Sequence, residues 1–228
     1  MMETAYTPPL GFAALTPLYD RAVRLMTREA AWRTRLVERI APRKGDIVLD
    51  VGSGTGSLAI VLTAAAPGCR VRGVDPDHAA VKLAKKKAAL AGSSATFEQG
   101  SFDIPATQND GGADTVTCSL VLHQVPLAEK KRLLRAMFVR LRPGGQLFIA
   151  DYGLQPTFIM RLAFRLTVQM IDGKGDTQPN ADGILPLLIE EAGFVGMAFL
   201  DSFNTATGRI DIIRAEKPRA AHLDGQKR

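Results

Sequence analysis

The stretch that most constrains the fold is VLDVGSGTG at residues 48–56, together with the run that follows it. Val48, Leu49 and Val51 form a short apolar run that predicts a buried strand. Three glycines follow at once, and the apolar, Ala-rich run SLAIVLTAAA then predicts a helix. A strand, a Gly-rich turn and a helix in direct succession are typical of the nucleotide-binding opening of a doubly wound α/β domain.

The residues of the turn indicate which ligand it holds. A dinucleotide-binding turn has the pattern G-x-G-x-x-G, but here the spacing is G-x-G-x-G and Ser57 stands where the last glycine would be. No lysine follows, so the turn is not a P-loop. Asp50 ends the strand just before the glycines, and its carboxylate would repel a pyrophosphate. A cationic ligand suits this site better, and S-adenosylmethionine (SAM) carries both an ammonium and a sulfonium group.

The nine-residue string resembles the first motif of the class I SAM-dependent methyltransferases. The resemblance covers about residues 46–217 and includes the later blocks SLVLHQV and LRPGGQLFIADY, in the usual order and at the usual spacing. It implies SAM as the cofactor, and it implies that the methionine end of SAM is held by Asp50, Gly52, Ser53, Gly54 and Gly56.

A second acidic residue supports this interpretation. The next predicted strand, in RVRGVDPD, ends at Asp75, nineteen residues after Gly56. A carboxylate at that place accepts hydrogen bonds from ribose hydroxyls. Asp75 would alternatively cap the following helix, although Asp77 serves that purpose equally well. We therefore assign Asp75 and the adjacent Pro76 to the ribose side of the cofactor.

The adenine end is assigned by resemblance alone. The block EQGSFDIP follows the third predicted strand, where the family usually has an acidic residue near the adenine amino group. Asp103 fits this role, with Ser101 and Phe102 beside it, and Leu120 of the SLVLHQV block is assigned to cofactor binding. The alternative is that Phe102 belongs to the core and Asp103 to a turn.

Strands and helices alternate after the first motif, which argues for a parallel sheet. The last two predicted strands, FVGMAFLDSFN and GRIDIIRAEK, are close enough to form a hairpin. The resemblance then implies an α/β, doubly wound (Rossmann-like), seven-stranded and mostly parallel sheet of order 3-2-1-4-5-7-6. At 228 residues one methyltransferase domain is expected. Its parts are a helical cap (1–44), a SAM-binding core (45–153), substrate-side helices (154–193), a closing hairpin (194–217) and a flexible tail (218–228).

The individual elements follow from periodicity and from Gly and Pro breakers. We expect a strand over 145–153 and a loop over 172–183. We expect helices over 28–40, 77–92, 127–145, 154–170 and 184–193.

Methyl transfer from a sulfonium demands little from side chains. An in-line displacement needs the nucleophile held close and collinear, and such positioning supplies roughly 7–11 kcal/mol of the barrier. A carbon or phenol nucleophile must also lose a proton, so a base helps. The catalytic candidates are His123, just past the fourth strand, and Asp151 and Tyr152, at the end of the fifth. His123 is alternatively a loop histidine that packs against the cofactor or caps a backbone group. No metal site is expected, because Asp151 has no obvious acidic partner.

The blocks LVLHQV and LRPGG look most like the small-molecule and lipid branch of the family, which includes the ubiquinone and menaquinone C-methyltransferases. The run 154–170 has apolar helical faces that either roof an apolar substrate pocket or lie on a membrane, with Arg161 and Arg165 near head groups. Both interpretations favour a small, apolar acceptor. The rival functions are a non-catalytic SAM-binding protein and a nicotinamide-dependent oxidoreductase.

The net charge of +6 and the pI of about 9.5 allow a nucleic-acid partner. The basic residues form no single patch, however, and Lys130, Lys131 and Arg132 are expected on a solvated helix face. We therefore expect no nucleic acid. The two cysteines match no zinc or redox spacing, and the N-terminus has no secretory pattern. No apolar run is long enough to span a membrane, so a cytoplasmic protein is expected, with its oligomeric state open.

Overall fold

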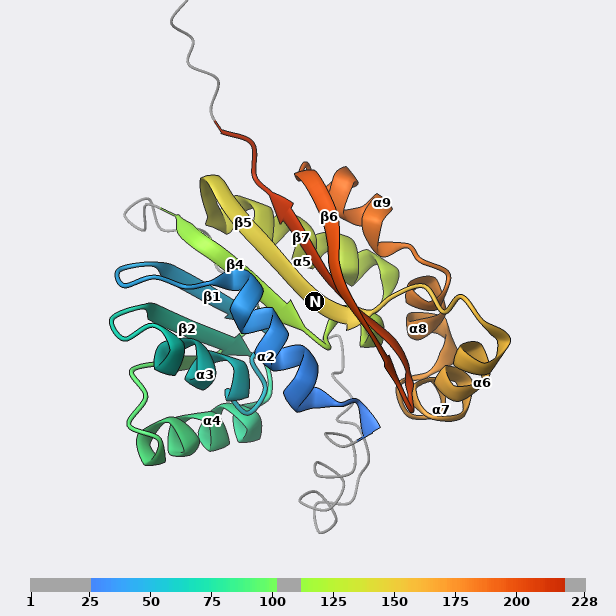
Figure 1. Ribbon diagram of the computed structural model, residues 1–228, viewed down its shortest axis with the longest axis horizontal. Helices are drawn as coiled ribbons and strands as arrows, with labels where there is room; N and C mark the ends of the chain where they lie inside the picture. The colour runs from blue at the N-terminus through green and yellow to red at the C-terminus, as the bar shows by residue number, and fades with distance from the viewer. Residues whose placement is uncertain (1–25, 102–111, 220–228) are drawn as a thin grey trace, which may run out of the picture.

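The computed structural model describes residues 26–101 and 112–219. Within them one sheet has the order β3-β2-β1-β4-β5-β7-β6 (Figure 1), which confirms the predicted order. The strands β3, β2, β1, β4 and β5 pair in parallel, while β7 is antiparallel to both β5 and β6. The strands are β1 (Ile47–Val51), β2 (Arg70–Asp75), β3 (Thr96–Gln99), β4 (Ala113–Ser119), β5 (Leu141–Tyr152), β6 (Val195–Thr205) and β7 (Gly208–Glu216).

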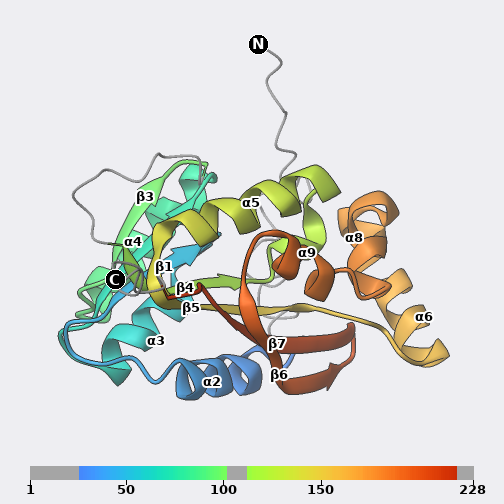
Figure 2. The same ribbon diagram turned by 90° about the horizontal axis from the view of Figure 1, so that it is seen from above.

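Helices cover both faces of the sheet, as a parallel sheet requires. In Figure 2, α2 and α3 lie on one side of the sheet and α5 and α9 on the other. The helices of these two layers are α2 (Glu29–Ile40), α3 (Ser57–Ala65), α4 (His78–Leu90), α5 (Leu127–Arg140) and α9 (Leu185–Glu191).

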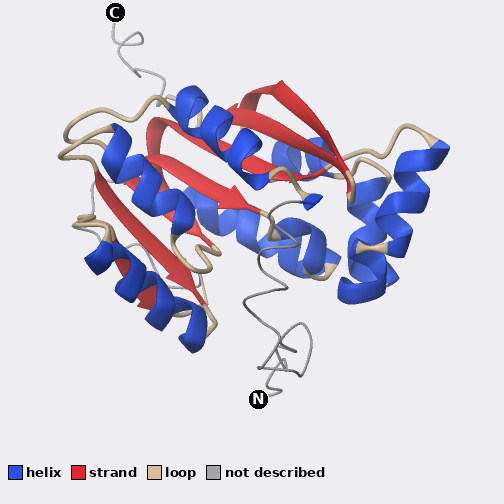
Figure 3. Cartoon of the chain, turned by 60° about the horizontal axis from the view of Figure 1, so that its bottom comes forward, coloured by secondary structure: helices blue, strands red, loops and turns tan. Residues whose placement is uncertain are grey.

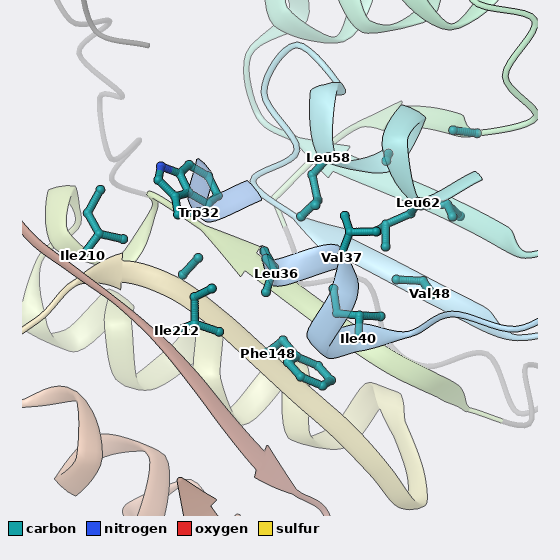
Figure 4. Close-up of a cluster of buried hydrophobic side chains, with 14 of the residues drawn as sticks. Trp32, Leu36, Val37, Ile40, Val48, Leu58, Leu62, Phe148, Ile210 and Ile212 are labelled. Carbon is teal, nitrogen blue, oxygen red and sulfur yellow. The ribbon is translucent and has the colours of Figure 1, made fainter. Parts of the chain in front are cut away.

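Each layer has its own core. On the first face Trp32 and Leu36 of α2 are fully buried and belong to one cluster with Phe148 of β5 and Ile212 of β7 (Figure 4). A side chain of this kind stabilises the fold by about 1.5–3 kcal/mol when it is fully buried. On the second face α5 and α9 cover the other side of β4 and β5. The two free cysteines, Cys69 and Cys118, are both buried.

Three further helices, α6 (Phe158–Leu166), α7 (Val168–Asp172) and α8 (Lys174–Ala181), lie together at one side of the molecule (Figure 3). They adjoin the carboxyl end of β5, because the Asn180 side chain of α8 donates to the Tyr152 carbonyl at 3.0 Å. The helix α8 also packs against η1 (Leu122–Gln124), a 3₁₀ turn that follows β4. The carboxyl edge of the sheet is the ligand-binding edge of open α/β folds.

Two expectations for this region were wrong. The predicted helix over 154–170 breaks at Thr167, whose hydroxyl bonds back to the Ala163 carbonyl at 2.6 Å and opens the backbone between α6 and α7. The predicted loop over 172–183 contains α8 instead, despite its glycines and Pro179. Buried polar contacts, including the Asn180 bond above and one from Thr177 to Gly173, outweigh the poor helix propensity of this segment.

The helix predicted over 127–145 is shorter, because α5 ends at Arg140. Leu141 already pairs with Ala113, so β5 begins there and not at Gly145. Its register then shifts across Pro143, which has no backbone N–H to donate.

Candidate active site

The Gly-rich turn brings the end of β1 against the loop after β4. Gly52 has φ +67°, and a Cβ at this residue would lie 2.3 Å from Val121 Cγ2, so only glycine fits. Gly54 also has positive φ, but a Cβ there would meet nothing within 4 Å. One side of the turn is therefore packed on the protein and the other is open for a ligand.

Asp50 lies under this turn, almost entirely buried at 1% exposure. Thr117 of β4 donates to its Oδ1 at 2.7 Å. Among the described residues, Asp50 Oδ2 and Ser53 Oγ are buried and have no hydrogen-bond partner. A buried oxygen without a partner is costly, so these two atoms indicate a ligand that donates hydrogen bonds here. The ammonium of SAM is such a donor.

Burial raises the pKa of Asp50 to about 7, against the lowering effects of the Thr117 hydrogen bond and the Arg33 charge. A bound cation would favour the ionised form. The ionised form of Asp50 is therefore unfavourable in the free protein and is stabilised when a cation binds beside it.

Asp75 ends β2 on the other side of the turn. Its Oδ2 accepts from the Gly54 N–H at 2.7 Å and its Oδ1 accepts from the Asp77 N–H at 2.9 Å. Each carboxylate oxygen retains a second acceptor position for a ribose hydroxyl. Burial raises the pKa of Asp75. Asp77, as expected, caps α4 by accepting from Ala79, which leaves Asp75 without that task.

The remaining cofactor candidates are only partly covered by the structure. Pro76 and Ser101 are exposed next to this edge, while Phe102 and Asp103 lie outside the described residues. Leu120 has φ +53°, which is unusual for a residue with a side chain, and its N–H donates to the Ala150 carbonyl at 2.9 Å. This strained residue turns the chain from β4 into η1.

Asp151 is fully buried at the end of β5 and organises η1. Its Oδ2 accepts from the backbone N–H groups of Val121, Leu122 and His123, at 3.1, 2.7 and 3.3 Å. Its Oδ1 accepts from the ring of His123 and from the N–H of Tyr152, both at 2.7 Å. The carboxylate thus caps the N-terminus of the 3₁₀ turn and is saturated with donors.

His123 lies between two carboxylates. Its Nδ1 faces Asp151 at 2.7 Å and its Nε2 lies 3.5 Å from Asp172 of α7. Burial alone would lower the pKa of His123, but the charge and hydrogen bond of Asp151, with those of Asp172, raise it to about 9. The two carboxylates therefore favour the protonated ring, an imidazolium, over the neutral form that could accept a proton.

We expect the His123 ring to titrate near pH 9 in ¹H–¹⁵N NMR spectra, and not near the usual value of about 6.5. The chain has three histidines, so the spectrum of His123→Gln identifies the resonance by its disappearance. A midpoint near 6.5 would contradict the paired geometry.

The hydroxyl and the ring of Tyr152 are both in contact with neighbouring side chains. Its hydroxyl shares a 2.6 Å hydrogen bond with Thr207, and its ring packs edge-on against His123, with centroids 4.9 Å apart. Phe164 of α6 lies on the same ring at 5.2 Å. Tyr152 therefore joins the fifth strand to α6, and its catalytic role stays a prediction, as do those of His123 and Asp151.

Lys130 was wrongly predicted on a solvated face, because its side chain is fully buried. Its ammonium donates to the carbonyls of Leu122, His123 and Val125 and, across to α8, to that of Asp176. Burial lowers the pKa of Lys130 to about 8. Asp151 and Lys130 thus bind η1 from opposite ends. Sequence reasoning also missed Asp172, which it placed in a loop.

Comparison with known proteins agrees with this geometry. Residues 48–145 match the family model described as a methyltransferase domain. A demethylmenaquinone methyltransferase of Thermus thermophilus is 29% identical over 70% of this chain and 72% of its own length. A ubiquinone biosynthesis O-methyltransferase of Thiobacillus denitrificans is 35% identical over 52% of this chain and 49% of its own. The structure of the SAM-dependent methyltransferase SibL aligns with TM-score 0.68, at 20% identity, over 94% of this chain and 64% of its own.

The fold, the Gly-rich turn and the unpartnered carboxylate define a SAM-binding protein. Together with the methyltransferase-domain match and the relatives, they support a SAM-dependent methyltransferase that resembles the class I enzymes, with SAM as its cofactor. The prediction from the nine-residue motif is confirmed, and the rival assignment to a nicotinamide oxidoreductase was wrong.

Proposed function

We propose that the protein transfers the methyl group of SAM to a small, apolar acceptor of the quinol or phenol type. The observation that carries this proposal is the buried, unpartnered Oδ2 of Asp50, in the strand just before the Gly-rich turn. The quinone-pathway names of the relatives support the acceptor class. The apolar residues of α6 and α7, beside the same edge of the sheet, support it independently.

Different residues of the proposed site would hold different parts of SAM. Asp50 and Ser53 would hold the methionine end of SAM, Asp75 and Pro76 the ribose, and Ser101, Phe102, Asp103 and Leu120 the adenine. When bound, SAM supplies an activated methyl group on a sulfonium. The chain then has to place the acceptor in line with it, and the rigid η1 turn lies on that side.

Proton removal from the acceptor would change how the turnover rate depends on pH. If His123 takes the proton, only its neutral form acts, so turnover should rise with pH until about 9. A rate that is flat between pH 7 and 9 would instead make His123 a positioning residue that holds η1 through Asp151. Neither result would contradict the proposal that the protein transfers a methyl group.

Asp75→Ala should weaken SAM binding by about 1–3 kcal/mol, because hydrogen bonds from ribose to a charged group are lost. Isothermal titration calorimetry measures this directly. The matched control is Asp77→Ala, which removes the neighbouring helix cap and lowers stability while leaving SAM affinity unchanged. Equal affinity of Asp75→Ala and the parent protein would reject the ribose assignment.

Turnover is tested with a short-chain, unmethylated naphthoquinol or a simple phenol and SAM, by following S-adenosylhomocysteine. Product formation with these acceptors, and none with nucleic acid, is the expected result. Tight SAM binding without turnover on any quinol or phenol would contradict the acceptor class.

A further inference from the structure

Exposed apolar side chains gather on α6 and α7 and on the segment before them. Phe158, Ile159 and Met170 are 79%, 77% and 76% exposed. Side chains so large and so open to water are uncommon in such a short stretch, and a contiguous group of them marks an interaction surface. We define the α6–α7 surface as Leu154, Phe158, Ile159, Leu162, Leu166, Met170 and Ile171, all exposed.

The charges on this surface have one sign. Between residues 154 and 175 the exposed charged side chains are Arg161, Arg165 and Lys174, and all three are basic. The acidic residue of this stretch, Asp172, is only 15% exposed and faces the His123 ring. Arg161 is engaged by the Gln155 carbonyl and by Asp182. Arg165 and Lys174 do not take part in these two contacts. Apolar residues bordered by cations are typical of helices that lie in a membrane interface.

The helices are also held so that this surface faces outward. Phe164 and Val168 are buried against the body of the protein and fix the opposite side of α6 and α7. The backbone break at Thr167 separates the two short helices, and both helices carry exposed apolar residues of this surface. No helix among residues 26–101 and 112–219 is long and apolar enough to cross a membrane.

We propose that the α6–α7 surface docks on an anionic lipid bilayer, with its apolar side chains inserted and Arg165 and Lys174 at the lipid phosphates. The net charge of +6 favours the same partner. This inference rests on the proposed function in one respect: a lipophilic quinol acceptor resides in the bilayer, and this surface adjoins the acceptor side of the site. Docking would deliver such an acceptor without its passage through water.

Vesicle flotation of the full chain tests the proposal. The protein should float with vesicles of phosphatidylcholine and phosphatidylglycerol, and much less with phosphatidylcholine alone. Phe158→Ser with Ile159→Ser should lower binding to the anionic vesicles at least about tenfold, because two side chains no longer leave water. Arg165→Gln with Lys174→Gln should lower binding to anionic vesicles about fivefold per cation and leave binding to neutral ones unchanged.

The matched control removes equally exposed apolar side chains elsewhere. Leu90→Ser with Val139→Ser changes two residues that are 79% and 59% exposed on α4 and α5, and it should not alter flotation. Calorimetric SAM affinity, unchanged in every variant, shows that the fold is intact. It also separates this test from the proposed function, because SAM binding does not depend on vesicles.

Three results would overturn the proposal. The first is that the full chain fails to float with anionic vesicles. The second is a concentration-dependent dimer, seen by analytical ultracentrifugation, that Phe158→Ser with Ile159→Ser dissociates, since a second copy would then cover the surface. The third is that this variant floats normally but loses turnover on a water-soluble phenol, which would make α6 the roof of a substrate pocket.

Discussion

Asp50→Asn should weaken SAM binding about 30-fold or more and, at the same time, make the free protein more stable at pH 8. The first effect follows because a buried cation loses the carboxylate that it pairs with, which costs about 2–5 kcal/mol. The second follows because the free protein keeps a buried charge that Thr117 and Arg33 offset only in part. Binding and stability are thus opposed at one residue.

The sign of the stability effect follows from the pKa. Asp50 has a raised pKa of about 7 in the folded protein and the ordinary value of 3.8 when unfolded. Between these values the folded form keeps its proton and the unfolded form does not, so stability falls as pH rises from about 4 to 7. Above pH 7 the whole penalty is present, roughly 4 kcal/mol for about three pKa units. Asp50→Asn removes this penalty. Part of the gain is lost because the new asparagine has a buried amide without a partner.

Two measurements check this prediction. Urea unfolding of the free proteins should show Asp50→Asn more stable at pH 8, with a difference that shrinks toward pH 5. Calorimetry should show SAM affinity of the parent protein falling up to about tenfold per pH unit below pH 7, and a flat, weak affinity for the variant. Asp182→Asn, an exposed carboxyl, serves as the control and should change neither quantity. Parent-like affinity in Asp50→Asn would place the ammonium elsewhere.

The sequence predicts the strand, the Gly-rich turn and the helix at the candidate cofactor site because these elements are built from consecutive residues. A strand, a tight turn and a helix are local structures, and Gly52, Gly54 and Gly56 follow one another within five residues. The sheet order needed more than local reasoning. It came from the resemblance of the ordered blocks to a known family, and strand pairing confirms it.

The cluster around η1, which we propose lies on the acceptor side, was harder to predict because it is made of contacts between distant segments. His123, Asp151 and Asp172 come from three elements, and no local pattern links the third to the other two. The α8 helix likewise depends on buried polar contacts that override its Gly and Pro content.

Lys130 is a different case, since its periodicity contained the information. It precedes Leu133, Leu134 and Met137 by three, four and seven residues, so it lies on the core face of α5. Its charge suggested a solvated face, and the two neighbouring basic residues, Lys131 and Arg132, strengthened that interpretation. A lysine at a core position of an amphipathic helix instead indicates a buried ammonium with carbonyl acceptors, as found here.

Asp151→Asn should destabilise the protein by about 3–5 kcal/mol, because it removes one member of a buried charge pair. Every partner of Asp151 is a donor: three backbone N–H groups of η1, the His123 ring and the Tyr152 N–H. An asparagine has one oxygen and one NH₂ group, so either orientation sets donors against donors. The imidazolium of His123 also loses its closest countercharge.

Urea unfolding at pH 7 measures this loss, which is a large share of the roughly 5–15 kcal/mol that stabilises a typical domain. His123→Asn and the double variant complete a double-mutant cycle. Because His123 and Asp151 act as one hydrogen-bonded unit, their effects should fail to add by about 1 kcal/mol or more. Additive losses, or an Asp151→Asn protein within 1 kcal/mol of the parent, would show that η1 holds its shape without this carboxylate. In that case some other interaction would have to hold Val121 against Gly52, where η1 meets the Gly-rich turn.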